Sequence, residues 1–85
     1  MVEMKNEEIM ADILNRLVTS GCWGKGHQDV DQIVNWMKSY VKQDGPRVKK
    51  AIRQLSQERF IGYKNNKRSI YLNKNYRTEI NALSL

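Results

Sequence analysis

The chain has one cysteine and one histidine among its 85 residues, and it has no long apolar run. A lone Cys22 excludes a disulfide within the chain, which predicts a reducing, intracellular setting. No stretch of roughly 18 apolar residues is present, so we expect no membrane-spanning helix and no membrane partner. The first eight residues, MVEMKNEE, lack the apolar segment of a signal peptide. These absences together predict a cytoplasmic protein.

The sequence is equally poor in the residues that metal sites and catalysis require. Cys22 and His27, with Asp29 and Asp31 nearby, match a zinc site poorly, because such sites usually take four Cys or His ligands. No phosphate-binding loop, dinucleotide motif or Ser/His/Asp order occurs. A nucleophilic pair of Cys22 and His27 would need an enclosed pocket, and a chain of this length buries too little surface to form one readily. We therefore expect no metal, no cofactor and no enzymatic activity.

Acidic residues are scarce in one part of the chain. The formal net charge is +6. Residues 42–77 hold eleven Lys or Arg against two Asp or Glu, a net of +9, whereas residues 1–41 hold four against six, a net of −2. Cations grouped in this way indicate a surface that faces a polyanion. The alternative is a basic surface without a partner.

The spacing of apolar residues predicts two helices in the first half. The first covers residues 6–21, NEEIMADILNRLVTSG, with Asn6 as a candidate N-cap and Gly21 as its stop. Its predicted buried stripe is Ile9, Met10, Ile13, Leu14, Leu17 and Val18. A glycine-rich loop, GCWGKGH, leads into a second helix within residues 28–41, for which His27 or Asp29 is the candidate cap. The apolar side of that helix is Val30, Ile33, Val34, Met37 and Val41.

A third helix is predicted in PRVKKAIRQLSQERF, residues 46–60, with Asp44 or Gly45 as its cap and Pro46 in the first turn. At about 100° per residue, one face is apolar and the opposite face is cationic and amide-bearing. The apolar face holds Val48, Ala51, Ile52 and Leu55. The polar face holds Lys50, Arg53, Gln54 and Gln57, with Arg47 and Lys49 at its edges and no acid.

The period then changes from 3.6 to 2 in FIGYKNNKRSIYLN. Ile61 and Tyr63 alternate before the polar turn KNNKR, and Ile70 and Leu72 alternate after it, which predicts a β-hairpin with a basic tip. The tail, residues 74–85, is expected to add a short helix with Tyr76, Ile80 and Leu83 on one side. The predicted fold class is α+β and mostly helical, in a single domain over residues 1–85.

Three helices followed by a hairpin resemble the winged helix-turn-helix superfamily from about Asn6 to Asn73. The resemblance includes the step from the third helix into the hairpin, at Leu55, Phe60 and Ile61. The GCWGKGH loop joined to DVD is also similar to a group of small archaeal winged-helix proteins of no known activity. The superfamily implies a third helix in the major groove of DNA and a hairpin, the wing, on phosphates or the minor groove.

The residue types agree with a double-stranded DNA partner. Lys and Arg neutralise phosphates or contact guanine, and Gln can donate and accept at adenine. The predicted contacts in the third helix are Arg47, Lys49, Lys50, Arg53, Gln54 and Gln57, and those in the wing are Lys64, Asn65, Asn66, Lys67 and Arg68. Lys25 and His27, before the second helix, are candidate phosphate contacts. A solvated helix face and a purely structural hairpin are the alternatives.

The sequence thus predicts a transcriptional regulator or a chromatin-associated factor. The competing hypothesis is a winged-helix module that binds an acidic protein partner. We also expect a homodimer on DNA through Tyr76, Ile80 and Leu83 packed against the first helix of a second copy, since two-fold pairing is common among helix-turn-helix proteins. A monomer whose tail packs on its own first helix is the alternative.

Overall fold

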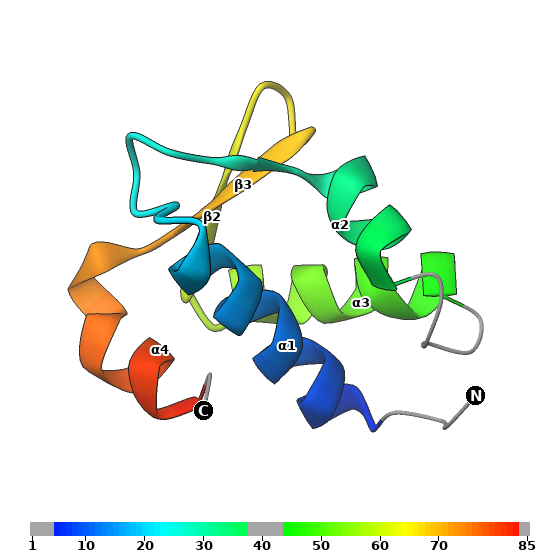
Figure 1. The fold of residues 1–85 in the computed structure, drawn as a ribbon, viewed down its shortest axis with the longest axis horizontal. Coiled ribbons are helices and arrows are strands. Elements are labelled where there is room, and N and C mark those ends of the chain that lie inside the picture. Colours follow the sequence, from blue (N-terminus) through cyan, green and yellow to red (C-terminus); the bar gives the residue numbers. More distant parts are fainter. Residues whose placement is uncertain (1–4, 38–43, 84–85) are drawn as a thin grey trace.

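The computed structural model of the protein describes residues 5–37 and 44–83, and their fold is α+β and mostly helical (Figure 1). The helices are α1 (Asn6–Thr19), α2 (Val30–Met37), α3 (Asp44–Gln57) and α4 (Arg77–Leu83), with a 3-10 turn η1 (Lys74–Tyr76) before the last. The strands are β1 (Gln28–Asp29), β2 (Ile61–Lys64) and β3 (Ser69–Leu72).

Helix α1 forms where its apolar stripe predicts, but its N-cap is Lys5 and the prediction of Asn6 was wrong. Lys5 has an extended backbone, and its N–H donates to the Glu8 carboxylate at 3.2 Å, so the helix begins one residue earlier. The Asn6 side chain instead donates to Gln54 Oε1 at 2.6 Å, which links α1 to α3. Gly21 ends the helix with a φ of +69°, as expected.

Helix α2 begins at Val30 and not at residue 28, because Gln28 and Asp29 form β1. Asp29 caps it, since its Oδ1 accepts the Asp31 N–H at 2.9 Å, and His27 is not needed for that role. Ile33 and Met37 are buried on its predicted apolar side. The predicted continuation to Val41 lies outside the described residues.

Helix α3 carries the predicted division between an apolar and a polar face. Val48, Ala51, Ile52 and Leu55 are all buried. Asp44 and Gly45 are its first two residues and do not flank it, which corrects their predicted capping role. The helix ends in a Schellman motif, in which the Phe60 N–H donates to the Leu55 carbonyl at 3.0 Å and Arg59 takes a φ of +67°.

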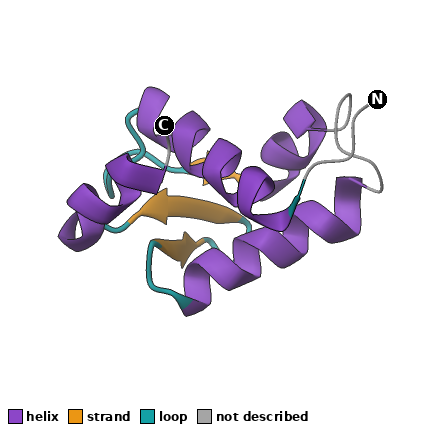
Figure 2. Ribbon diagram, turned by 90° about the horizontal axis from the view of Figure 1, so that it is seen from below, coloured by secondary structure: helices purple, strands orange, loops and turns teal. Residues whose placement is uncertain are grey.

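The predicted hairpin is confirmed, but a third strand joins it. The sheet order is β1-β3-β2, with Ile61 paired to Leu72 and Tyr63 to Ile70 across the hairpin. β1 adds two pairs, Gln28 with Ile70 and Asp29 with Ser69. The sequence did not predict β1, because two residues are too few to display a period of two. Figure 2 shows the hairpin emerging directly from the end of α3.

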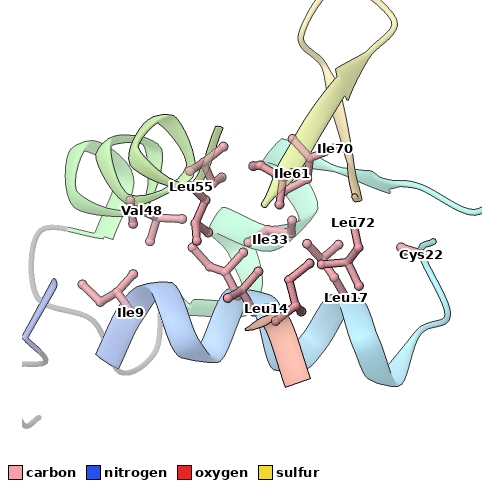
Figure 3. Close-up of a cluster of buried hydrophobic side chains, with 14 of the residues drawn as sticks. Ile9, Leu14, Leu17, Cys22, Ile33, Val48, Leu55, Ile61, Ile70 and Leu72 are labelled. Atoms are coloured by element: carbon pink, nitrogen blue, oxygen red, sulfur yellow. The ribbon is translucent and has the colours of Figure 1, made fainter. Parts of the chain in front are cut away.

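One hydrophobic cluster joins the four helices α1 to α4 to the sheet (Figure 3). Ile70 and Leu72 project from β3 into it and are at most 1% exposed, and Ile33 of α2 meets them there. Since odd and even positions of a strand face opposite ways, the same strands turn Gly62, Lys64 and Tyr71 away from the core.

The tail forms the expected short helix and packs on α1 of its own chain. Ile80 is fully buried there, and the Tyr76 ring meets the Phe60 ring edge-on at 5.8 Å. Of the predicted dimer stripe only Leu83 is exposed, at 48%, so Ile80 cannot serve a second copy in this arrangement. Within residues 5–37 and 44–83, no helix is long and apolar enough to cross a membrane.

Candidate functional site

An open cleft of about 800 Å³ lies between the start of α2, the polar side of α3 and the hairpin. We call it the front cleft. Four cations line it, two from α3 and two from the tip of the hairpin: Lys49, Arg53, Lys67 and Arg68. All four are exposed. Two elements that are separated along the chain therefore present their cations to the same space.

The α3 residues of the front cleft follow the helical repeat. Lys49, Arg53 and Gln57 are spaced four apart, so they lie along one side of the helix. That side borders the cleft, while Lys50 is exposed on α3 but does not line it. Arg47 is half-buried and also lies outside the lining. The predicted α3 contacts are thus divided between the cleft and other parts of the helix surface.

The turn of the hairpin sets the position of the other two cations. Asn65, Asn66 and Lys67 have φ values of +55°, +56° and +68°, in the left-handed region that Asn tolerates better than most residues. The turn brings Lys67 Nζ to 5.8 Å from the centre of the Tyr63 ring. The Arg68 carbonyl accepts the Val30 N–H at 2.8 Å, which attaches the tip to the first residue of α2.

Two carboxylates share the front cleft with the cations. Asp29 and Asp31 line it from the start of α2, and both are exposed. The predicted cationic face of α3 contains no acid, but the assembled cleft adds these two carboxylates from another element. The pairing of Asp29 with Ser69 places α2 beside the basic tip. No local sequence signal reports this, because the pairing spans forty residues.

Gln54 lies on a different side of α3 from the front cleft. Its side chain accepts from Asn6 and lines a smaller cleft of about 280 Å³ between α1 and the end of α3, with Leu83 at its edge. A glutamine held in this way is not presented to a partner of the front cleft, in contrast to the predicted base contact. Gln57, one helical turn further, does line the front cleft.

A third cleft, of about 410 Å³, lies beside the opposite face of the hairpin, and we call it the back cleft. Lys64, predicted to act with the rest of the wing, belongs to it. Its Nζ donates to the Gly24 carbonyl at 2.6 Å and lies 5.4 Å from the centre of the Tyr71 ring. The Tyr71 ring covers Gly62, where a Cβ atom would come within 2.5 Å of the ring.

The two residues predicted to meet phosphate before α2 lie apart from the front cleft. Lys25 is exposed and lines the back cleft, while His27 is exposed and lines neither cleft. Asn65 and Asn66 are exposed at the tip without lining the front cleft. Trp23, in the glycine-rich loop, packs against the core, and the Arg77 guanidinium lies 4.7 Å from its ring centre.

Cys22 does not have the surroundings of a reactive thiol. It is 3% exposed, and burial raises the pKa of its thiol above the ordinary value, which disfavours the thiolate. In the part of the chain that the structure describes, no three His, Cys, Asp or Glu side chains gather in a way that could hold a metal ion.

Comparisons of the chain with known protein families, with curated proteins and with solved structures found no match. Function must therefore be inferred from the chemistry of the two clefts.

Proposed function

We propose that the protein is a winged helix-turn-helix protein that binds double-stranded DNA, as a transcriptional regulator or chromatin-associated factor. The order of three helices followed by a hairpin supports this interpretation, and the short strand before α2 is compatible with it. In the proposed complex, α3 enters the major groove and the tip of the hairpin lies on the sugar–phosphate backbone.

The observation that carries the proposal is the convergence of cations from α3 and the hairpin tip on one open cleft. A duplex carries phosphates on both sides of its major groove, so a helix inside the groove needs positive charge on the helix and beside it. Lys49 and Arg53 supply the positive charge on the helix, and Lys67 and Arg68 supply the positive charge beside it. An enclosed small-molecule site would instead be mostly apolar.

Arg53 is the proposed base-reading residue. It is exposed near the middle of the cleft-facing side of α3, one turn from Lys49 and one turn from Gln57. An arginine there can donate two hydrogen bonds to guanine, and Gln57 can pair with adenine. Arg53→Ala is expected to weaken specific binding by about 1–3 kcal/mol and to relax the preference at one base pair.

A module that binds an acidic protein partner is the second candidate. The carboxylates of Asp29 and Asp31 in the front cleft favour a protein over DNA, because they would repel phosphates at one edge. An acidic protein could place its carboxylates against the four cations of the cleft and a basic side chain against these two carboxylates. The two functions differ in their dependence on salt. DNA binding releases counterions, so the logarithm of its affinity falls steeply and linearly with the logarithm of salt concentration.

The test is duplex binding, measured by fluorescence anisotropy over a series of salt concentrations, after selection of bound duplexes from a random pool. The double variant Lys49→Gln/Arg53→Gln should bind more weakly and with a shallower salt slope. Arg59→Gln is the control, since Arg59 is an exposed cation that lines neither cleft. Equal losses in the variant and the control would reject the front cleft as the DNA site, and no duplex binding by the unmodified chain would reject the proposed function.

Formation of a homodimer on DNA remains a proposal, now with Leu83 as its remaining exposed apolar contact. Sedimentation equilibrium of the unmodified chain and of Leu83→Ala, each with and without a palindromic duplex, measures it directly. A single 10.0 kDa species and a one-to-one complex on every duplex would exclude the dimer.

A further inference from the structure

The back cleft is a second cationic surface, and its lining contains no carboxylate. Lys25, Lys64 and Lys74 line it, and Arg77 lies next to it on the Trp23 ring. The front cleft, by contrast, mixes four cations with two carboxylates. The three lysines come from three separate stretches of chain: the glycine-rich loop, the hairpin and the turn before α4. Because no single stretch is strongly basic and aromatic, this cleft cannot be recognised in the sequence.

The two clefts open on opposite faces of the sheet. Tyr63 faces the front cleft, whereas Lys64, the next residue, faces the back cleft together with Tyr71. This follows from the alternation of side chains along a strand. In Figure 1 the loop after α1 and the turn before α4 lie on one side of the hairpin, and α2 and α3 lie on the other. A duplex in the front cleft would therefore lie on the other face of the sheet from the back cleft.

The aromatic rings of the back cleft are already covered, which decides what kind of ligand fits. The Tyr71 ring lies against Gly62, and the Lys64 ammonium lies 5.4 Å from the centre of the same ring. Trp23 packs on the core and carries the Arg77 guanidinium. A cation therefore already lies close to each ring, and an unpaired base that stacked there, as in single-strand binding, would have to displace it. The exposed ammonium groups of Lys25 and Lys74 are suited to backbone phosphates.

The back cations also lie away from the hairpin tip. Lys67 and Arg68 precede β3, while Lys74 follows it, and the four residues of β3 separate them by roughly 13 Å at about 3.3 Å per residue. Lys74 would therefore meet a different phosphate group from those at the tip, and it lines the cleft on the other face of the hairpin.

We propose that the back cleft binds the phosphate backbone of a second DNA duplex, so that one protein molecule bridges two duplexes. The proposal rests on the proposed function, because the first duplex occupies the front cleft. Lys64 has a supporting role in it: its ammonium holds the Gly24 carbonyl and so keeps the loop with Lys25 beside the hairpin.

The experiment uses the full chain and two duplexes of the same sequence, one immobilised on beads and one fluorescent. Bridging is measured as the amount of fluorescent duplex retained on the beads, and single-duplex affinity is measured separately by anisotropy. In the double variant Lys25→Gln/Lys74→Gln, bridging should fall about tenfold because two phosphate-binding ammonium groups are removed, while single-duplex affinity stays within about twofold. Lys5→Gln/Arg59→Gln removes two exposed cations outside both clefts and should change neither quantity.

The outcomes separate this proposal from the one on which it rests. If the unmodified chain binds one duplex and retains no second, bridging is excluded and the DNA-binding function stands. If it binds no duplex, both proposals fail. The proposal is also overturned if the Lys25/Lys74 variant bridges as well as the unmodified chain. It is overturned as well if the variant loses as much single-duplex affinity as bridging. Sedimentation of the variant must match that of the unmodified chain, because bridging that disappears together with a dimer would assign the effect to the dimer.

Discussion

Lys64 and Lys67 lie three positions apart in the same hairpin, yet the fold gives them different roles. The Lys64 ammonium is hydrogen-bonded to the Gly24 carbonyl and stacked on Tyr71, on the back face. Lys67 is exposed at the tip and leans over Tyr63, on the front face. In this hairpin the lysine inside a strand is bonded to a loop, and the lysine in the turn is left exposed. The identity of a basic residue therefore says less about its role than its position relative to the pleat.

The change expected to have the largest effect removes a buried side chain from β3, the central strand of the sheet whose two faces border the two clefts. Ile70 is fully buried in β3 and pairs with Tyr63 and Gln28 on its two sides. Ile70→Ala should lower the free energy of unfolding by about 2–5 kcal/mol, because it leaves a cavity where the sheet meets the helices. Urea denaturation measures the loss, with Ile70→Val as the conservative control at about 0.5–1.5 kcal/mol. An effect of the same small size for both variants would contradict the packing around β3.

The second change tests the structural role of Lys64. Lys64→Gln should lower stability by about 1 kcal/mol, because it removes a partly exposed, charge-assisted hydrogen bond to the Gly24 carbonyl. Lys67→Gln is the matched control and should change stability by less than about 0.5 kcal/mol, as exposed substitutions usually do. Thermal and urea unfolding of the two variants are compared. Identical stabilities would show that the bond of Lys64 to the loop contributes nothing measurable.

The third change tests the hairpin tip as a phosphate-binding element. The double variant Lys67→Gln/Arg68→Gln should make the salt slope of DNA binding shallower by about 1 to 2, because each phosphate that a cation neutralises contributes roughly 0.9 to the slope. The measurement is the slope of log affinity against log salt, beside that of Lys64→Gln, which should keep the slope of the unmodified chain. An unaltered slope in the double variant would leave the tip as a structural turn only.

The change with the smallest expected effect tests whether a carboxylate in the lining of the front cleft lowers its affinity for DNA. Asp31 lines the front cleft, and no carboxylate lines the back cleft. Asp31→Asn should raise DNA affinity by roughly twofold, which corresponds to about 0.5 kcal/mol for an exposed charge. Asp12→Asn makes the same change in net charge without lining either cleft and is the comparison. A rise of equal size in both variants would mean that only net charge matters.

The regular elements could largely be predicted from the sequence, because their signals are local. The apolar stripe of α3 is buried as its 3.6-residue period predicts, and the hairpin forms where the period changes to two. The orientation of Lys64 could also have been derived, since Ile61 and Tyr63 on the core side require Lys64 on the other. The prediction of KNNKR as one basic tip did not separate Lys64, which lies in β2 and faces the back cleft, from the four residues of the turn.

The remaining features of the clefts depend on contacts between distant segments. Asn6 donates to Gln54 across 48 positions, on the side of α3 that does not border the front cleft. Asp29 reaches the basic tip only through the pairing of β1 with β3. Neither contact has a periodicity, a motif or a spacing that a single sequence displays, so both could be found only in the folded chain.

By itself the sequence determined the order of the helices and the hairpin, the position of the turn and the cationic side of α3, because these depend on residues that are neighbours along the chain. The tertiary structure alone decided which charges share a cleft. It placed Asp29 and Asp31 with the cations of the front cleft, and it joined Lys25 to Lys74 behind the hairpin. The physical reason is that burial of one apolar core fixes how the elements pack, and the polar side chains are carried to wherever that packing leaves them.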